Sequence, residues 1–185
     1  MKGRERPSPS QQRGGSVEGH SLPSERARQI SVIGSSLCSE DSELWRLAEE
    51  VGRLLAEAGA TVLCGGRGGV MEAAARGAAR AGGVVIGIIP GVSVEEANPY
   101  CTHVVASAIG FARNLAVVAS GDVVIAIGGA WGTLSEIGHA RSFDRTVVAL
   151  GSWALVSEEM DGAPGVLQVE TAAEAVAAAL AAVGA

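Results

Sequence analysis

The sequence predicts a single α/β domain in which a mostly parallel, doubly wound sheet has helices on both faces. Short apolar runs typical of buried strands alternate with segments whose apolar residues recur at helical spacing. Hydrophobic residues make up 48% of the chain but aromatic residues only 3%, so small aliphatic side chains are expected to build the core, as in a parallel sheet covered by helices. Glycine-rich turns follow several of the apolar runs, and ligands bind at such strand ends.

The expected elements alternate along the chain. The first strand is 30–33, and the helix after it begins near Ser39 or Asp41 and ends at Ala58, before Gly59. The elements expected after that helix are a strand at 61–64, a helix at 70–81, a strand at 84–88, a polar loop at 90–99, a short strand at 103–105, a helix at 111–119, a strand at 123–127, a helix after the glycine turn that follows, a strand at 146–150, an edge strand at 166–169 and a helix at 171–182.

Charge divides the chain into two parts. The net charge is −6, and residues 1–28 hold six Lys or Arg against three Glu, so the remainder carries −9. Residues 1–28 are rich in Ser, Pro, Gly, Gln and Arg and poor in large apolar residues, which predicts a disordered basic tail before a domain at 29–185. The tail could contact nucleic acid, but a solvated extension is favoured, and the acidic domain argues against nucleic acid as a partner.

Composition excludes several classes of protein. The only lysine is Lys2, so the domain has no lysine for a pyridoxal Schiff base or a Walker A loop. No apolar stretch approaches the ~20 residues that span a bilayer, and the N-terminus has no secretory apolar region. The three cysteines have no metal-ligand spacing, and His103 and His139 form no set with them, so we expect no metal site and a reducing cytoplasm.

Three glycine-bearing turns follow strands, after Ile33, Cys64 and Ile127. Glycine allows close approach of the backbone, and a helix that starts there directs free N–H groups and its positive end at an anion. Because the carboxyl ends of parallel strands share one edge of the sheet, the turns are expected to converge on one phosphate-binding crevice. The residues predicted to bind there are Gly34, Ser35, Ser36, Gly65, Gly66, Gly68, Gly69, Gly128, Gly129, Gly132 and Thr133.

A nicotinamide or flavin site is not expected, because neither of the first two turns has the G-x-G-x-x-G spacing of a dinucleotide fingerprint and the second strand ends in Cys64. Arg67 lies within the second turn, where it either contacts the ligand or is merely exposed to solvent. Asp122 precedes a strand and is interpreted as a turn residue. Trp131 could stack on a base or pack against a neighbouring subunit.

Two charged residues have positions that need an explanation. Arg113 opens a helix, where the helix dipole disfavours a cation, so we expect it to face the crevice and pair with a ligand phosphate or with Glu136. Thr133 could cap the helix after the third turn and offer its hydroxyl to a phosphate. Glu136 could complete a capping box with it or face the ligand as a carboxylate.

Three segments in this order carry a family resemblance: G-G-x-G-G-V-M-E at 65–72, F-A-R-N at 111–114 and G-G-A-W-G-T-L-S-E at 128–136. They resemble the Rossmann-like LOG superfamily over residues 29–183. That superfamily includes the Lonely Guy cytokinin-activating phosphoribohydrolases, long mislabelled as lysine decarboxylases, and the molybdenum-cofactor carrier proteins. The resemblance implies a ligand site that also includes Met71 and Asn114.

In the phosphoribohydrolases an Arg-Lys pair and a P-G-G-x-G-T-x-x-E motif bind a nucleoside monophosphate, and the arginine and glutamate support cleavage of the N-glycosidic bond. Arg113 and Glu136 match these two catalytic residues. Asn114 replaces the lysine, and Gly128-Gly129-Ala130 replaces P-G-G, as in the carrier-type branch.

These features lead to three hypotheses. The first is a homo-oligomeric binding or carrier protein for a nucleoside monophosphate or the pterin of molybdenum cofactor, with no cofactor required for its own function. The second is a nucleoside 5′-monophosphate phosphoribohydrolase. The third is a nucleotide-sensing module that signals through its oligomer.

Overall fold

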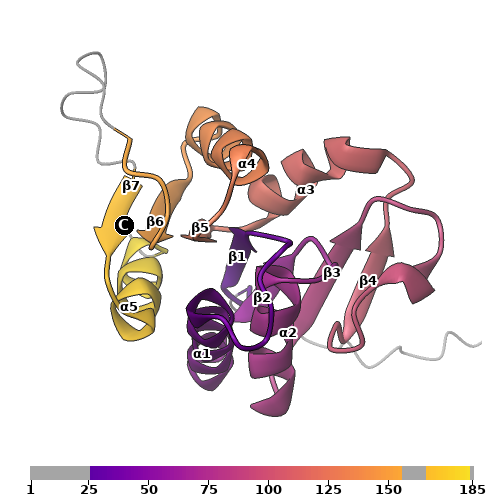
Figure 1. Cartoon of the computed structure of the whole chain (residues 1–185), viewed down its shortest axis with the longest axis horizontal. Helices are drawn as coiled ribbons and strands as arrows, with labels where there is room; N and C mark the ends of the chain where they lie inside the picture. Colours follow the sequence, from indigo (N-terminus) through magenta and orange to yellow (C-terminus); the bar gives the residue numbers. More distant parts are fainter. Residues whose placement is uncertain (1–25, 156–165, 184–185) are drawn as a thin grey trace, which may run out of the picture.

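The computed structural model describes residues 26–155 and 166–183, which form one sheet with helices packed against it (Figure 1). The seven strands have the order β4-β3-β2-β1-β5-β6-β7, and all six pairings are parallel. The predicted doubly wound α/β class is confirmed. The elements are β1 (Gln29–Gly34), α1 (Glu43–Glu57), β2 (Thr61–Cys64), α2 (Val70–Arg80), β3 (Val85–Ile89), η1 (Val94–Glu96), β4 (His103–Ala106), η2 (Gly110–Ala112), α3 (Arg113–Ser120), β5 (Val123–Ile127), α4 (Trp131–Ser142), β6 (Thr146–Leu150), β7 (Val166–Val169) and α5 (Ala172–Ala182).

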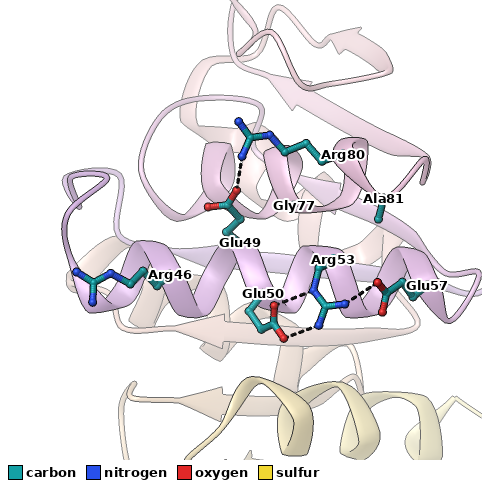
Figure 2. Close-up of a pocket in the computed structure, with 8 residues that line it drawn as sticks. All are labelled: Arg46, Glu49, Glu50, Arg53, Glu57, Gly77, Arg80 and Ala81. Carbon is teal, nitrogen blue, oxygen red and sulfur yellow. Dashed lines mark hydrogen bonds and ion pairs between the residues drawn. The ribbon is translucent and has the colours of Figure 1, made fainter.

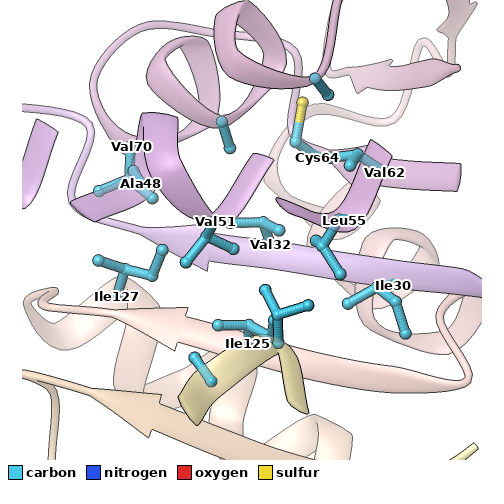
Figure 3. Packing of buried hydrophobic residues seen from close by; sticks show 14 of the residues in the cluster. Ile30, Val32, Ala48, Val51, Leu55, Val62, Cys64, Val70, Ile125 and Ile127 are labelled. Atoms are coloured by element: carbon cyan, nitrogen blue, oxygen red, sulfur yellow. The ribbon is translucent and has the colours of Figure 1, made fainter. Parts of the chain in front are cut away.

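Helices cover both faces of the sheet. Helices α1, α2 and α5 pack on one face through small and β-branched residues, and the fully buried Val51 and Leu55 of α1 contact the strands there (Figure 3). Helices α3 and α4 cover the other face, where Val117 and Ile137 are fully buried (Figure 1). The core therefore uses aliphatic side chains, as the low aromatic content predicts. Among the described residues, no helix has both the length and the apolar character needed to cross a membrane.

Most predicted boundaries lie within a residue or two of those observed. Helix α1 begins later than expected, because Ser42 is its N-cap and accepts a hydrogen bond from the backbone N–H of Trp45. Strand β3 is displaced by one residue from its expected position. The connection from β3 to β4 contains only the short 3₁₀ helix η1, so the strict alternation of strands and helices is interrupted at that edge.

Asp122 has the structural role expected of it at the start of β5. Its carboxylate accepts a hydrogen bond from the backbone N–H of Gln29 at 2.9 Å and pairs with Arg26. The carbonyl of Arg28 accepts from the N–H of Thr61. Residues 26–28 of the predicted tail thus contact the domain, whereas residues 1–25 lie outside the described residues.

Helices α1 and α2 approach each other unusually closely through two glycines. A Cβ at Gly52 would lie 2.0 Å from the carbonyl oxygen of Ala74, and a Cβ at Gly77 would lie 1.9 Å from that of Glu49. Both obstacles are backbone atoms of a packed helix, which cannot give way as a side chain would. Glycine at these positions sets the distance between the helices, and thereby the place of α2, whose N-terminus follows the second glycine turn.

Replacing Gly77 with alanine is expected to lower the free energy of unfolding by about 3 kcal/mol, at the upper end of overpacking costs, because α2 must move away from α1. Gly138 is the matched control. It is an exposed glycine inside α4 with no atom within 4 Å of its Cβ position, so Gly138→Ala should raise stability by about 0.5–1 kcal/mol. Urea denaturation of both variants measures the difference, and equal effects would contradict the packing argument.

Candidate anion-binding cleft

A cleft opens at the carboxyl ends of the strands, where the strand order reverses. From β1 the chain proceeds through β2, β3 and β4 on one side and then returns to β5 on the other. This reversal is where doubly wound sheets bind ligands. The cleft has a volume of about 540 Å³ and is lined by Val32, Ile33, Gly34, Ser35, Ser36, Leu37, Gly65, Arg67, Gly68, Met71, Pro90, Phe111, Arg113, Asn114, Ala130, Gly132, Thr133 and Glu136.

The structure brings the three predicted turns together at this cleft. Eleven of the residues singled out from the sequence line it: Gly34, Ser35, Ser36, Gly65, Gly68, Met71, Arg113, Asn114, Gly132, Thr133 and Glu136. Four further predicted glycines do not line it: Gly66, Gly69, Gly128 and Gly129. All four have positive φ values, between 55° and 112°, and therefore shape the turns.

The contacts of two of these four glycines show why no other residue fits. Gly69 precedes α2, and a Cβ there would lie 2.3 Å from the carbonyl oxygen of Ser35. Gly129 has φ +112°, and a Cβ there would lie 2.4 Å from the Cβ of Thr133. Gly69 therefore allows the first and second turns to pack closely, and Gly129 allows the third turn to fold tightly against the start of α4.

Arg113 is the only arginine among the buried charged residues of the described chain, with 8% of its side chain exposed. Its guanidinium lies directly over Gly65, where a Cβ would be 2.6 Å from both terminal nitrogens. Nη1 donates to the side-chain oxygen of Asn114 at 2.5 Å and lies 4.0 Å from a carboxylate oxygen of Glu136. The buried Nε has no hydrogen-bond partner among the described residues. The guanidinium thus retains unused hydrogen-bonding capacity inside the cleft.

Glu136 lies in the second turn of α4 with its side chain 10% exposed. Burial raises the pKa of this carboxyl to about 7, although the nearby Arg113 guanidinium acts in the opposite direction. Burial lowers the pKa of Arg113, an effect that the charge of Glu136 opposes. Near neutral pH the cleft therefore contains a permanent cation beside a carboxyl group that exists in both protonation states.

The capping roles considered for Thr133 and Glu136 are wrong. The N-cap of α4 is Ala130, which has no capping side chain, and Thr133 is already within the first helical turn. The first intrahelical hydrogen bond runs from the N–H of Leu134 to the carbonyl of Ala130. The N–H groups of the three preceding residues have no acceptor within the described part of the chain, so they can bind an anion at the positive end of the helix.

The N-terminus of α2 is less available for an anion. The N–H of its first residue, Val70, donates to the carbonyl of Ser35 at 2.9 Å, so the first and second turns are hydrogen-bonded to each other. Arg67, whose role the sequence left open, lines the cleft but is 46% exposed and forms an ion pair with Glu96 at 2.9 Å. The turn after β5 is thus the most open anion-binding position of the three.

Sequence reasoning did not single out Leu37, Pro90 or Phe111 as residues of the cleft. Leu37 and Phe111 are 92% and 89% exposed, so they give the cleft an apolar rim. Pro90 directly follows β3, and the rule that sites lie at strand ends could have identified it. Trp131, 76% exposed, does not line the cleft and stacks on Trp153 with ring centroids 5.5 Å apart.

A second groove lies between α1 and α2, away from the strand ends (Figure 2). Its charged side chains largely satisfy one another. Arg53 bridges Glu50 and Glu57, and Arg80 pairs with Glu49 (Figure 2). The charged side chains of this groove therefore pair within and between the two helices, and they leave fewer unpaired groups for a ligand than the cleft with Arg113 does.

No group of three or more His, Cys, Asp or Glu side chains able to hold a metal ion occurs within the described ranges. His103 and His139, considered from the sequence, are both exposed and lie on different elements, β4 and α4. The cysteines described in the structure are all free.

Comparison with known proteins identifies the family of this chain. The model of the SLOG cluster4 family matches residues 27–177. The chain belongs to the SLOG cluster4 family. A protein of Archaeoglobus fulgidus is 43% identical over 122 residues, which are 66% of this chain and 79% of that protein. The predicted relationship to the LOG superfamily and its Rossmann-like fold is thereby confirmed.

Two similar solved structures are molybdenum-cofactor proteins. The molybdenum cofactor binding protein of Rippkaea orientalis is 31% identical with a TM-score of 0.77, covering 88% of this chain and all of that one. The molybdenum cofactor carrier protein of Chlamydomonas reinhardtii is 29% identical with a TM-score of 0.73, covering 86% of this chain and all of that one. The DNA processing protein A of Streptococcus pneumoniae, 21% identical with a TM-score of 0.63, shares the fold and covers 82% of this chain and 61% of that one.

Proposed function

We propose that this protein binds a phosphorylated, nucleotide-like ligand in the cleft and acts as a binding or carrier protein. The observation that carries the proposal is the Arg113 guanidinium, which is 8% exposed, faces the cleft and leaves its buried Nε without a partner. A buried cation with unused donors favours an anionic ligand, because hydrogen bonds to the anion would replace the water that the guanidinium loses on burial. The free N–H groups at the start of α4 supply a second anion-binding element.

A ligand of the molybdopterin type is the form of this proposal that the relatives support best. Two similar structures are described as binding or carrying molybdenum cofactor. Asn114 occupies the position of the lysine in the phosphoribohydrolase motif and accepts a hydrogen bond from Arg113. The apolar rim of Leu37 and Phe111 would contact the planar ring of a pterin or a base while the phosphate lies deeper in the cleft.

We expect a phosphorylated small molecule to be released when freshly purified protein is denatured, and mass spectrometry to identify it as a pterin or a nucleotide. A nucleoside monophosphate such as AMP should also raise the melting temperature, because it binds the native state preferentially. Adenosine, which is AMP without its phosphate, is the matched control and should produce a much smaller shift. If neither AMP nor a pterin phosphate shifts the melting temperature at millimolar concentration, the proposal fails.

Hydrolysis of a nucleoside monophosphate is the second candidate function. It is favoured by the buried Glu136 carboxyl, whose pKa is raised to about 7 beside the Arg113 guanidinium. As a carboxylate it would stabilise positive charge developing on the ribose, and Arg113 would orient the phosphate. Adenine release from AMP distinguishes the two functions. A hydrolase should release adenine and lose the activity by orders of magnitude in Glu136→Gln, whereas a carrier should release none.

Self-association is part of the proposal. The stretch from β4 to α3 exposes Val105, Ile109, Phe111 and Leu115, each by at least 38%. Such apolar exposure favours contact with a second copy. Light scattering of the purified protein would give the oligomer size.

The free cysteines favour a reducing compartment such as the cytoplasm.

A further inference from the structure

Two cysteines from separate segments meet beneath the second glycine turn. Cys64 ends β2 and is paired in register with Gly87 of β3, so the side-chain positions of both residues point to the same face of the sheet. Gly87 has no side chain, and the sulfur of Cys101 lies 2.6 Å from the place where its Cβ would be. The sulfur of Cys101 therefore fills the space beside Cys64, whose position in the packed core is visible in Figure 3.

The surroundings of the two sulfur atoms shift their pKa values in opposite directions. The thiol of Cys101 lies within hydrogen-bonding reach of the Cys64 sulfur, which also accepts from the N–H of Gly66 at 3.4 Å. The hydrogen bond from Cys101, together with that N–H and the charge of Arg113, lowers the pKa of Cys64. The neighbouring Cys64 sulfur, together with burial, raises the pKa of Cys101. A thiol of lowered pKa with a second thiol beside it is the arrangement that disulfide chemistry requires.

The two cysteines differ in access to solvent. Cys64 is fully buried, whereas Cys101 is partly exposed. A small oxidant would therefore meet Cys101 first, with Cys64 positioned behind it to complete the reaction. Cys38 lies in the loop after β1, apart from this pair, where its sulfur faces the carbonyl of Ser35 at 3.9 Å.

We propose that Cys64 and Cys101 form a reversible disulfide, and that this modification loosens the glycine turn of residues 65–69 and weakens ligand binding in the cleft. The oxidant is a small disulfide. The sulfur of Cys101 attacks one sulfur of that molecule, which forms a mixed disulfide on Cys101, and the first small thiol leaves with the proton of Cys101. The sulfur of Cys64 then attacks Cys101, and the second small thiol leaves with the remaining proton. Two protein thiols are oxidised and one small disulfide is reduced to two thiols.

The coupling to the turn runs through the segment that contains Cys101. In this segment the N–H of Asn98 donates to the carbonyl of Gly66 at 2.8 Å, and its side-chain amide donates to that of Arg67 at 3.1 Å. The Cys101 sulfur is 3.6 Å from the side-chain oxygen of Asn98. An S–S bond removes the thiol proton that Cys101 donates to the side-chain oxygen of Asn98, and it turns the Cys64 sulfur that accepts from the N–H of Gly66 into a disulfide sulfur, a weaker acceptor. Both changes remove support from a turn that lines the cleft.

Oxidised glutathione tests the disulfide, with Cys38→Ser as the background so that only the pair remains. In excess oxidised glutathione this protein should lose both thiols and two hydrogen atoms of mass, and dithiothreitol should restore them. Adding Cys64→Ser should trap glutathione on Cys101, because no second thiol can displace it. Adding Cys101→Ser should leave the buried Cys64 unmodified. Retention of both thiols by the Cys38→Ser protein, or glutathione attached to Cys64, would overturn the proposal.

Hydrogen exchange tests the coupling without a ligand. The peptide covering residues 65–69 should exchange faster in the oxidised than in the reduced Cys38→Ser protein, whereas a peptide from α5 should not change. Unchanged exchange at 65–69 would overturn the coupling.

The effect on the cleft rests on the proposed function, and AMP is the probe. Oxidation should weaken AMP binding by about two- to tenfold, the effect of losing one backbone hydrogen bond. Equal affinity of the oxidised and reduced forms would refute the regulation. If AMP binds neither form while the disulfide forms and exchange at 65–69 rises, the proposed function fails and the modification site stands.

Discussion

Replacing Arg113 with alanine is expected to weaken AMP binding by about 10- to 150-fold, which corresponds to about 1.5–3 kcal/mol for a hydrogen bond to a charged group. The guanidinium lies over Gly65, and its Nε has no hydrogen-bond partner among the described residues. Because the described chain has no other buried arginine, no second buried guanidinium can take its place in the cleft. Arg113→Lys should recover only part of the affinity, because a lysine lacks the planar, two-pronged donor geometry. Calorimetric titration of the variants with AMP measures the loss.

Arg67 provides the matched control for this prediction. It lines the same cleft, but it is 46% exposed and already paired with Glu96. Arg67→Ala should weaken binding less than about threefold, because exposed ion pairs and contacts contribute well under 1 kcal/mol. Equal losses in the two variants would mean that the cleft attracts anions only through its general positive potential.

Glu136 is expected to make stability depend on pH. Its pKa is about 7 in the folded protein, above the value of about 4.3 in an unfolded chain, so between these values the folded state binds more protons. The favourable contribution of the protonated carboxyl is complete below pH ~4.3 and is lost as pH rises through 7. The complete loss amounts to about 4 kcal/mol, since each pKa unit corresponds to ~1.4 kcal/mol.

Glu136→Gln isolates this effect, because the amide has the shape of the neutral acid and does not titrate. The free energy of unfolding of the wild type, measured relative to Glu136→Gln, should fall by about 3 kcal/mol between pH 4.5 and pH 8. Other titrating groups affect both proteins and cancel. Urea denaturation at several pH values provides the measurement, and a difference independent of pH would show that the carboxyl of Glu136 titrates normally.

The fold and the place of the cleft followed from local patterns in the sequence. Apolar runs that end in glycine are sufficient to identify parallel strands and the edge at which they bind ligands, and Arg113 was noticeable because a cation opens a helix. The structural role of each glycine could not be predicted from the sequence. Gly65 makes room for a guanidinium, whereas Gly69 makes room for the backbone of another turn.

Two features required the three-dimensional structure because they depend on neighbours distant in sequence. Thr133 and Glu136 have the spacing of a capping box, but α4 begins at Trp131 and thereby places both inside the helix. Cys64 and Cys101 approach each other only because β3 pairs with β2 in a register that sets Gly87 opposite Cys64. Neither the start of a helix within a glycine turn nor the register of strands is encoded in spacing alone.

A crystal structure of the protein grown with AMP would show directly whether the cleft binds a phosphorylated ligand. We expect the phosphate in the cleft, with its oxygens bound by the Arg113 guanidinium and by the N–H groups of Gly132 and Thr133 at the start of α4. The ring of the base should lie toward the apolar rim of Leu37 and Phe111. A cleft without AMP at a saturating concentration, or AMP bound elsewhere on the protein, would contradict the account.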